Sequence, residues 1–176
     1  MSVEENKTKH IIREYLIEEG LLRKNLPDTQ NKLEFGFQFI FPPSPIGQKM
    51  IVLKPIDRNL IVISNQIQIS QQHIDILNSL KDNKKVRFFM DLRRMFLVKD
   101  AFFRIDVQNY RYEISDQIFL DKTGNISKNS FFESIRKVFT CAALSNMILN
   151  DYCLMKMKPE DFSDSKEFTS DFSLYS

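Results

Sequence analysis

The chain has 176 residues, of which 43% are hydrophobic and 27% charged, with a formal net charge of +2. This length suits one globular domain with a sizeable core. A charge so close to neutral does not indicate an obligate nucleic-acid binder, and four glycines make a glycine-loop nucleotide site unexpected. The opening stretch MSVEENKTKH lacks the apolar core of a secretory signal, and no apolar run approaches the about 20 residues that span a bilayer. We therefore expect a cytoplasmic protein without membrane contact.

The first half of the chain predicts one helix followed by three strands. Residues 7–22 have an apolar stripe of helical period, and Gly20 is a candidate end for that helix. LEFGFQFIF (33–41) alternates strictly and places four phenylalanines on one face. After the break PPSPIG, strands are predicted over KMIVLKP (49–55) and NLIVISNQIQIS (59–70).

The second half predicts two helices, two strands and a long helix. Ser70 is a candidate N-cap for a helix through Leu80, and a longer helix is predicted over residues 84–99. Strands follow over 101–107 and 110–120. Ser130 and Glu133 form an S-x-x-E capping box for a helix that reaches the Cys153 region. These elements predict an α+β fold in two layers, with a five-stranded antiparallel sheet and the helices packed largely on one face.

The chain is expected to form one domain over residues 1–153, followed by an acidic, serine-rich tail at 154–176. The tail has no sustained periodicity, so we predict that it is poorly ordered when alone. Its aromatic residues could instead dock on a groove or on a partner. Cys141 and Cys153 fall on one predicted helix, about 18 Å apart, which is too far for a disulfide and favours a reduced state.

Three stretches, FFMDLRRMFL (88–97), YEISDQIFLD (112–121) and SKNSFFESIRKVF (127–139), resemble an uncharacterised archaeal family with the fold of class I type III secretion chaperones and YbjN-like proteins. The resemblance covers roughly residues 7–153. It implies that the third and fifth predicted strands are neighbours at the centre of the sheet and that dimers are usual. Secretion chaperones bind partner polypeptides, so the resemblance also implies a protein or peptide partner, by analogy of fold alone.

Catalytic and metal chemistry find little support in the sequence. His10 and His73 lie on different predicted helices, without neighbours at metal-ligand spacing. There is no G-x-S-x-G motif, and neither cysteine lies near a histidine in the sequence. We therefore predict no catalytic residues, no metal site and no cofactor, and a protein that is not an enzyme.

Residues 81–104 hold eight Lys or Arg against three Asp, interleaved with phenylalanines. Such a mixture is typical of single-strand nucleic-acid binders. In helical projection, however, Asp91 shares the polar stripe and the aromatic residues fall on the opposite side. Nucleic-acid binding is therefore the alternative hypothesis, through Lys84, Lys85, Arg87 and Arg94.

The apolar side of the predicted helix 84–99 is too broad to be covered by one sheet. We therefore predict a homodimer through this helix, with an interface drawn from Phe88, Leu92, Arg93, Met95 and Phe96. Arg93 projects from the middle of the apolar side, and three interpretations stay open. Its guanidinium reaches solvent, pairs with a carboxylate across an interface, or contacts a ligand.

Two stretches echo each other, ISNQI (63–67) and ISDQI (114–118). Both fall within long predicted strands, so we interpret the echo as architecture and not as a duplicated active site. If the strands are neighbours, the copies meet near a local twofold axis. Asn65 and Asp116 then point inward and either form a hydrogen-bonded pair or each lie at a bulge, and we favour the bulge.

Overall fold

The computed structural model describes residues 3–28, 31–81 and 83–154, except for the side chains of residues 3–6. Its elements in chain order are α1 (Val3–Glu18), β1 (Leu22–Asn25), β2 (Leu33–Phe41), β3 (Gln48–Pro55), β4 (Leu60–Gln68), α2 (Gln71–Ser79), α3 (Lys84–Val98), β5 (Phe102–Asp106), β6 (Arg111–Phe119) and α4 (Lys128–Leu154). All residues of the predicted tail beyond Leu154 lie outside the described part.

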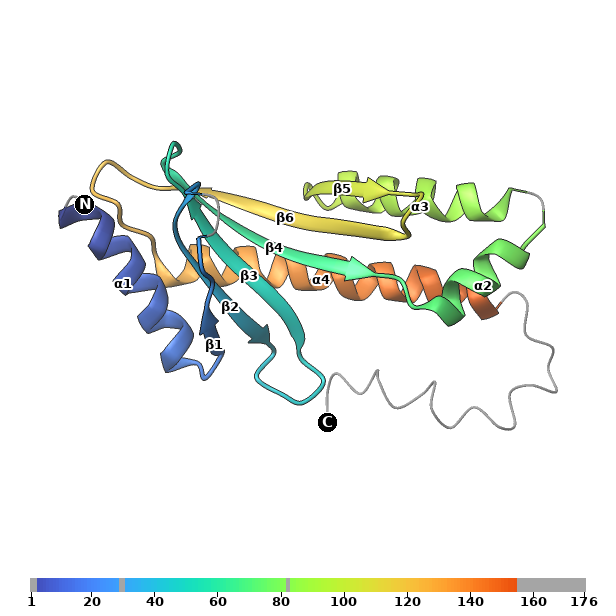
Figure 1. The fold of residues 1–176 in the computed structure, drawn as a ribbon, viewed down its shortest axis with the longest axis horizontal. Helices are drawn as coiled ribbons and strands as arrows, with labels where there is room; N and C mark the ends of the chain where they lie inside the picture. Colours follow the sequence, from blue (N-terminus) through green and yellow to red (C-terminus); the bar gives the residue numbers. More distant parts are fainter. Residues whose placement is uncertain (1–2, 29–30, 82, 155–176) are drawn as a thin grey trace.

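The strands form one antiparallel sheet in the order β1-β2-β3-β4-β6-β5. The α+β class is confirmed, but the predicted count of five strands is wrong, because β1 adds a sixth at one edge. The helices lie along one face of the sheet, as predicted (Figure 1). There α4 packs along β4 and β6, α1 against β1 and β2, and α3 against β5 and α4.

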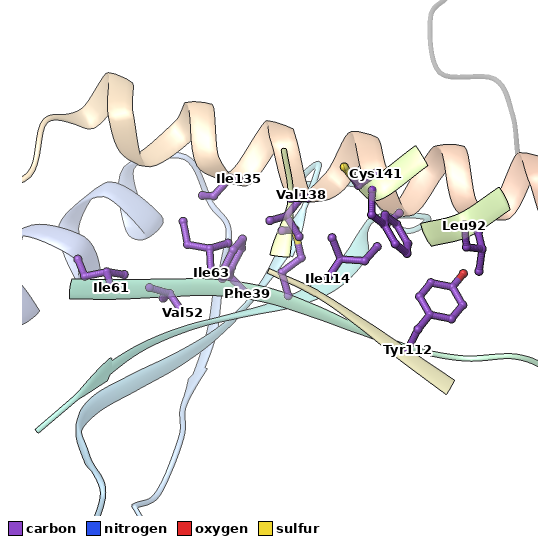
Figure 2. Close-up of a cluster of buried hydrophobic side chains, with 14 of the residues drawn as sticks. Phe39, Val52, Ile61, Ile63, Leu92, Tyr112, Ile114, Ile135, Val138 and Cys141 are labelled. Carbon is purple, nitrogen blue, oxygen red and sulfur yellow. The ribbon is translucent and has the colours of Figure 1, made fainter. Parts of the chain in front are cut away.

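The core lies between this face and the helices (Figure 2). In β3 alternate residues are buried, as the period of two in the sequence predicts. In β2 and β4 most residues of this phase are buried as well, together with Gly36, Leu60 and Ser64 of the opposite phase. Each large apolar side chain fully buried in this way contributes about 1.5–3 kcal/mol to stability. The sheet contributes Phe39, Val52, Ile61, Ile63, Tyr112 and Ile114, and α4 contributes Ile135, Val138 and Cys141.

The two echoed stretches occupy neighbouring strands, which confirms the prediction that the third and fifth predicted strands are adjacent. In the register of β4 with β6, Ser64 lies opposite Ser115, Ile63 opposite Asp116, and Asn65 opposite Ile114. The two copies therefore meet around a local twofold axis at the serine pair. The β4–β6 register continues without a shift from Leu60 to Gln68, so the favoured bulge at Asn65 and Asp116 is absent.

Three helix ends differ from the prediction by more than one residue. The first helix begins at Val3 and ends at Glu18, four residues early at each end, and Gly20 follows in the left-handed region with φ 67°. The last helix begins at Lys128, not after Ser130, and the Ser130 amide donates to Ser127 Oγ at 3.0 Å. Ser127 is thus the N-cap.

Candidate functional site

The inner face of α3 belongs to the core. Phe88, Leu92 and Phe96 are fully buried within the single chain. Phe88 packs edge-on against Tyr152 of α4, with ring centroids 5.7 Å apart, and Phe96 packs against Phe103 of β5 at 5.4 Å. The structure therefore corrects the sequence-based interface, because these three side chains are enclosed by their own subunit and do not face a partner.

The outer face of α3 carries a second, exposed set of residues. Val86, Met90, Arg93 and Leu97 follow one another at spacings of four, three and four, which places them on one line along the helix. The exposed fractions of Val86, Met90 and Leu97 are 59%, 39% and 68%. We call these four residues the α3 stripe. Met95, the remaining predicted interface residue, is partly buried and packs against the core.

Arg93 lies in the α3 stripe with its side chain exposed. Its guanidinium Nη1 is 3.7 Å from the sulfur of Met90, and no described carboxylate pairs with it. Within the single chain Arg93 therefore reaches solvent, and the other two interpretations, pairing across an interface between subunits and contact with a ligand, stay predictions. Its aliphatic stem extends the apolar line between Met90 and Leu97.

Exposed apolar side chains are frequent on α3. Of the ten large apolar residues that are exposed in the described part of the chain, four lie on this helix: Val86, Met90, Leu97 and Val98, the last of them 82% exposed. Two more, Phe102 of β5 and Phe119 of β6, are 55% and 76% exposed and lie on the face of the sheet away from the helices. Exposed apolar side chains grouped as on α3 mark interaction sites in soluble proteins.

The basic residues considered for nucleic-acid contacts are Lys84, Lys85, Arg87 and Arg94. Two of them are engaged within the chain. The Lys85 ammonium lies 4.3 Å from the centre of the Tyr110 ring, and Arg94 Nη1 lies 3.3 Å from Asp91 Oδ1. Phe88 and Phe89, which lie within this basic segment, are buried and offer no surface for base stacking.

A short polar chain holds α3 against α4. The Tyr152 hydroxyl donates to Asp91 Oδ2 at 2.6 Å, and Asp91 also pairs with Arg94. Burial, together with the adjacent Asp91 carboxylate, raises the pKa of Tyr152 to about 12. These contacts fix the rotation of α3 about its axis, so that the α3 stripe faces away from the sheet.

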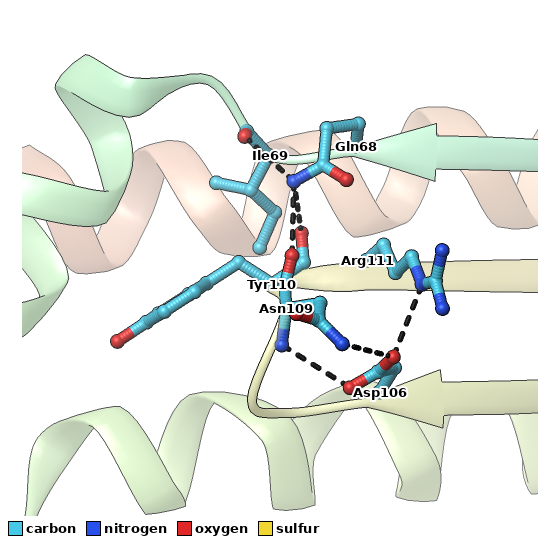
Figure 3. Close-up of polar contacts among 6 residues, drawn as sticks. All are labelled: Gln68, Ile69, Asp106, Asn109, Tyr110 and Arg111. Atoms are coloured by element: carbon cyan, nitrogen blue, oxygen red, sulfur yellow. Dashed lines mark hydrogen bonds and ion pairs between the residues drawn. The ribbon is translucent and has the colours of Figure 1, made fainter.

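The turn between β5 and β6 is tied to β4 by side-chain hydrogen bonds (Figure 3). Gln68 Nε2 donates to the carbonyls of Asn109 and Tyr110 at 3.0 and 3.2 Å. Asp106 accepts from the Asn109 amide and side chain and from Arg111 Nε, and these bonds lower the pKa of its carboxyl. These bonds therefore hold the turn in place where β5 ends and β6 begins, with Asp106 opposite Arg111.

Asn65 and Asp116 point inward, as predicted, but each has its own partner. Asn65 donates to Gln48 Oε1 at 2.7 Å, and Asp116 accepts from Lys137 of α4 at 3.0 Å. A second carboxylate, Asp100, lies 3.5 Å from the Lys137 ammonium. Partial burial acts to lower the pKa of Lys137, but the bond to Asp116 and the two negative charges outweigh it, and the pKa is raised. The mutual pair considered from sequence is therefore not formed.

The two cysteines are buried, and the pKa values of both cysteines and of His73 are shifted by burial. Cys141 and Cys153 are free thiols, and burial raises the pKa of both, that of Cys153 to about 11, so neither is an activated nucleophile. Burial lowers the pKa of His73. Among the described residues, no three or more His, Cys, Asp or Glu are grouped for a metal ion. Within residues 3–28, 31–81 and 83–154, no helix has the length and apolarity to cross a membrane.

Comparison with known proteins places the chain in a family and shows its fold in two solved structures. Residues 8–149 match the family described as "Uncharacterized conserved protein (DUF2299)". An uncharacterized protein from Methanothermobacter thermautotrophicus is 22% identical, with a TM-score of 0.72 over 82% of this chain and 97% of that one. A chain of the ExsC–ExsE complex is 15% identical, with a TM-score of 0.53 over 85% of this chain and 97% of that one. No curated protein matches with significant sequence similarity.

Proposed function

The chain belongs to the DUF2299 family, and we propose that it is a non-enzymatic homodimeric module that binds a protein or peptide partner in the cytoplasm. The observation that carries the proposal is the α3 stripe with the exposed apolar residues beside it. The same fold occurs in the ExsC–ExsE complex, an assembly of two different proteins, which supports a role in protein binding by analogy of fold. Two free, buried cysteines are consistent with a reducing compartment.

The second copy is the occupant that we assign to the α3 stripe. Spacings of four and three residues are those of the seam between two packed helices. With the twofold axis perpendicular to α3, the two α3 helices run antiparallel, which sets Val86 of one protomer near Leu97 of the other and brings the Met90–Arg93 segments together. The Arg93 guanidinium then lies at the rim, where its charge remains hydrated.

A dimer with this geometry needs more surface than the α3 stripe alone provides. Stable interfaces bury about 800 Å² on each partner, whereas α3 is only about 22 Å long for its 15 residues. Val98, which is 82% exposed at the end of α3, extends the exposed apolar surface to the end of the helix. We therefore expect the second copy to cover the whole length of α3 together with the polar residues beside the α3 stripe.

Sedimentation equilibrium tests the dimer. The wild-type chain is expected to sediment as a dimer at micromolar concentration, and Met90→Arg as a monomer with unchanged circular dichroism, because each protomer would add a guanidinium beside the Arg93 of its partner. Met147→Arg is the matched control, since Met147 is 47% exposed on α4 and lies outside the α3 stripe. A wild-type monomer, or a Met90→Arg dimer as stable as the control, would contradict the proposal.

A second candidate function is nucleic-acid association through Lys84, Lys85, Arg87 and Arg94, which the exposed guanidinium groups of Arg87 and Arg94 on α3 favour. A mobility shift with single-stranded RNA or DNA at about 50 mM salt tests it, because phosphate contacts weaken steeply as salt rises. If no shift appears at that salt concentration, this function is eliminated.

A further inference from the structure

The central strand β6 is longer than the edge strand that pairs with it. Ladder pairing with β4 runs from Arg111 to Phe119, whereas β5 pairs only as far as Phe102 opposite Ser115. The last four residues of β6, Asp116–Phe119, are therefore paired on the β4 side alone. Figure 1 shows this part of β6 extending past the end of β5. We call it the β6 edge.

Two hydrogen bonds at opposite ends of β6 establish which backbone groups point to the free side. The Tyr110 carbonyl accepts from Ile69 at 3.0 Å, and the Leu120 amide donates to Asn59 at 3.1 Å, so both of these residues face β4. In an antiparallel sheet, successive residues direct their amide and carbonyl groups alternately to the two neighbours. Gln117 and Phe119 therefore direct both groups away from β4, where no described strand pairs with them.

Side chains around the β6 edge differ between the two faces of the sheet. On the face away from the helices, Phe119 is 76% and Phe102 55% exposed. On the helix face, Asp116 and Asp100 flank the Lys137 ammonium. The Asp100 side chain is fully exposed, which leaves its carboxylate open to a further cation.

We propose that an extended segment of a partner protein adds to the sheet as a strand along the β6 edge, in line with β5. Every second residue of the segment is apolar and packs on Phe102 and Phe119, and the alternate residues include Lys or Arg, which meet Asp100. The four residues of the β6 edge span about 14 Å, so four or five residues of the segment pair. This inference names the partner-binding surface of the proposed function and rests on it.

The charges disfavour the other two occupants. From Pro159 onward the chain's own C-terminal residues carry five carboxylates and one lysine, which the exposed Asp100 carboxylate repels. A second copy paired by its own β6 edge would bring the exposed Asp100 carboxylates of both protomers near each other. A cationic, alternating partner segment meets neither penalty.

Fluorescence anisotropy with a labelled heptapeptide of alternating lysine and valine tests the proposal on the full-length protein. We expect saturable binding that weakens at least about tenfold in Gln117→Pro, which removes one donor from the free side only, and that changes little in Gln117→Ala. The same peptide with glutamate in place of lysine is expected to bind about tenfold more weakly. Absence of saturable binding up to about 1 mM, or equal binding by wild type and Gln117→Pro, overturns the proposal.

Two further measurements keep the test decisive. If Gln117→Pro fails to fold, Phe119→Ser replaces it, because that side chain is exposed and its loss removes apolar contact with the peptide. Amide hydrogen exchange of the free protein is expected to be fast at Gln117 and Phe119; slow exchange there would mean that the tail or a second copy covers the edge, which overturns the proposal. Sedimentation of the same samples separates the two hypotheses: a monomer that binds the peptide contradicts only the dimer, and a dimer without binding contradicts only the added strand.

Discussion

Replacing Ser145 with alanine tests how strongly one buried polar link joins the sheet to α4. The Tyr112 hydroxyl, on a side chain 2% exposed, donates to Ser145 Oγ at 2.8 Å, and Ser145 donates in turn to the Ala142 carbonyl at 2.7 Å. Ser145→Ala leaves the phenol buried without an acceptor, which costs about 1–3 kcal/mol. Tyr112→Phe removes the phenol but leaves the Ser145 bond to Ala142, and costs about 0.5–1.5 kcal/mol.

Urea unfolding of wild type, both single variants and the double variant at one protein concentration measures these differences. Ser145→Ala is expected to lose more stability than Tyr112→Phe, and its melting temperature to fall by about 2–4 °C per kcal/mol. In the double variant no polar group is orphaned, so its loss should be smaller than the sum of the singles by about 1 kcal/mol. Additive losses, or a Ser145→Ala protein at least as stable as Tyr112→Phe, would refute the reasoning.

Burial raises the pKa of Tyr112 to about 12, so the unfolded chain loses this proton near pH 10, before the folded chain does. The unfolding free energy measured by chemical denaturation should therefore fall between pH 10 and 12, and in Tyr112→Phe this fall should be smaller by up to about 2.7 kcal/mol. Lys54 forms an ion pair with Glu34, both side chains 11% exposed; Lys54→Met should cost about 3–5 kcal/mol because the carboxylate is left buried, and a double variant that also replaces Glu34 by leucine should recover much of the loss in the same assay. Ser127→Ala should cost about 0.5–2 kcal/mol as the loss of an N-cap, and Ser130→Ala less than about 0.5 kcal/mol; equal losses would contradict the assignment of Ser127 as the cap.

The strand that sequence patterns missed, β1, shows where local signals end. Its four residues, LRKN, include one apolar side chain, and three of the four are exposed. Nothing in such a stretch distinguishes a strand from the frayed end of the preceding helix. What makes it a strand is pairing with β2, in which Leu22 lies opposite Phe39 and Asn25 opposite Phe37. That pairing depends on a strand that starts eight residues later in the chain.

The start of α4 illustrates a choice between two acceptable local signals. Both Ser127 and Ser130 are good N-caps, and only the second has a glutamate three residues on. The earlier start is supported from outside the helix, because the Lys128 ammonium lies 2.9 Å from Glu18 and 2.6 Å from Glu19 at the end of α1. A capping pattern predicts that a helix begins nearby, and tertiary contacts decide at which residue.

The helix α3 shows why an interaction surface is harder to predict than a core. The broad apolar side of this helix implies that two different surfaces cover it, but the sequence of the helix does not say which of its apolar residues face the sheet. The large aromatic residues fill the inner part because Phe88 and Phe96 meet the rings of Tyr152 and Phe103. The smaller flank, with Val86 and Leu97, is left outside. The β6 edge could not be predicted from the sequence for a similar reason. It exists because β6 is longer than β5, and the sequence of each strand by itself does not show this difference. Exposed surfaces of this kind are defined by what their neighbours leave uncovered, so they become visible only when the neighbours are placed.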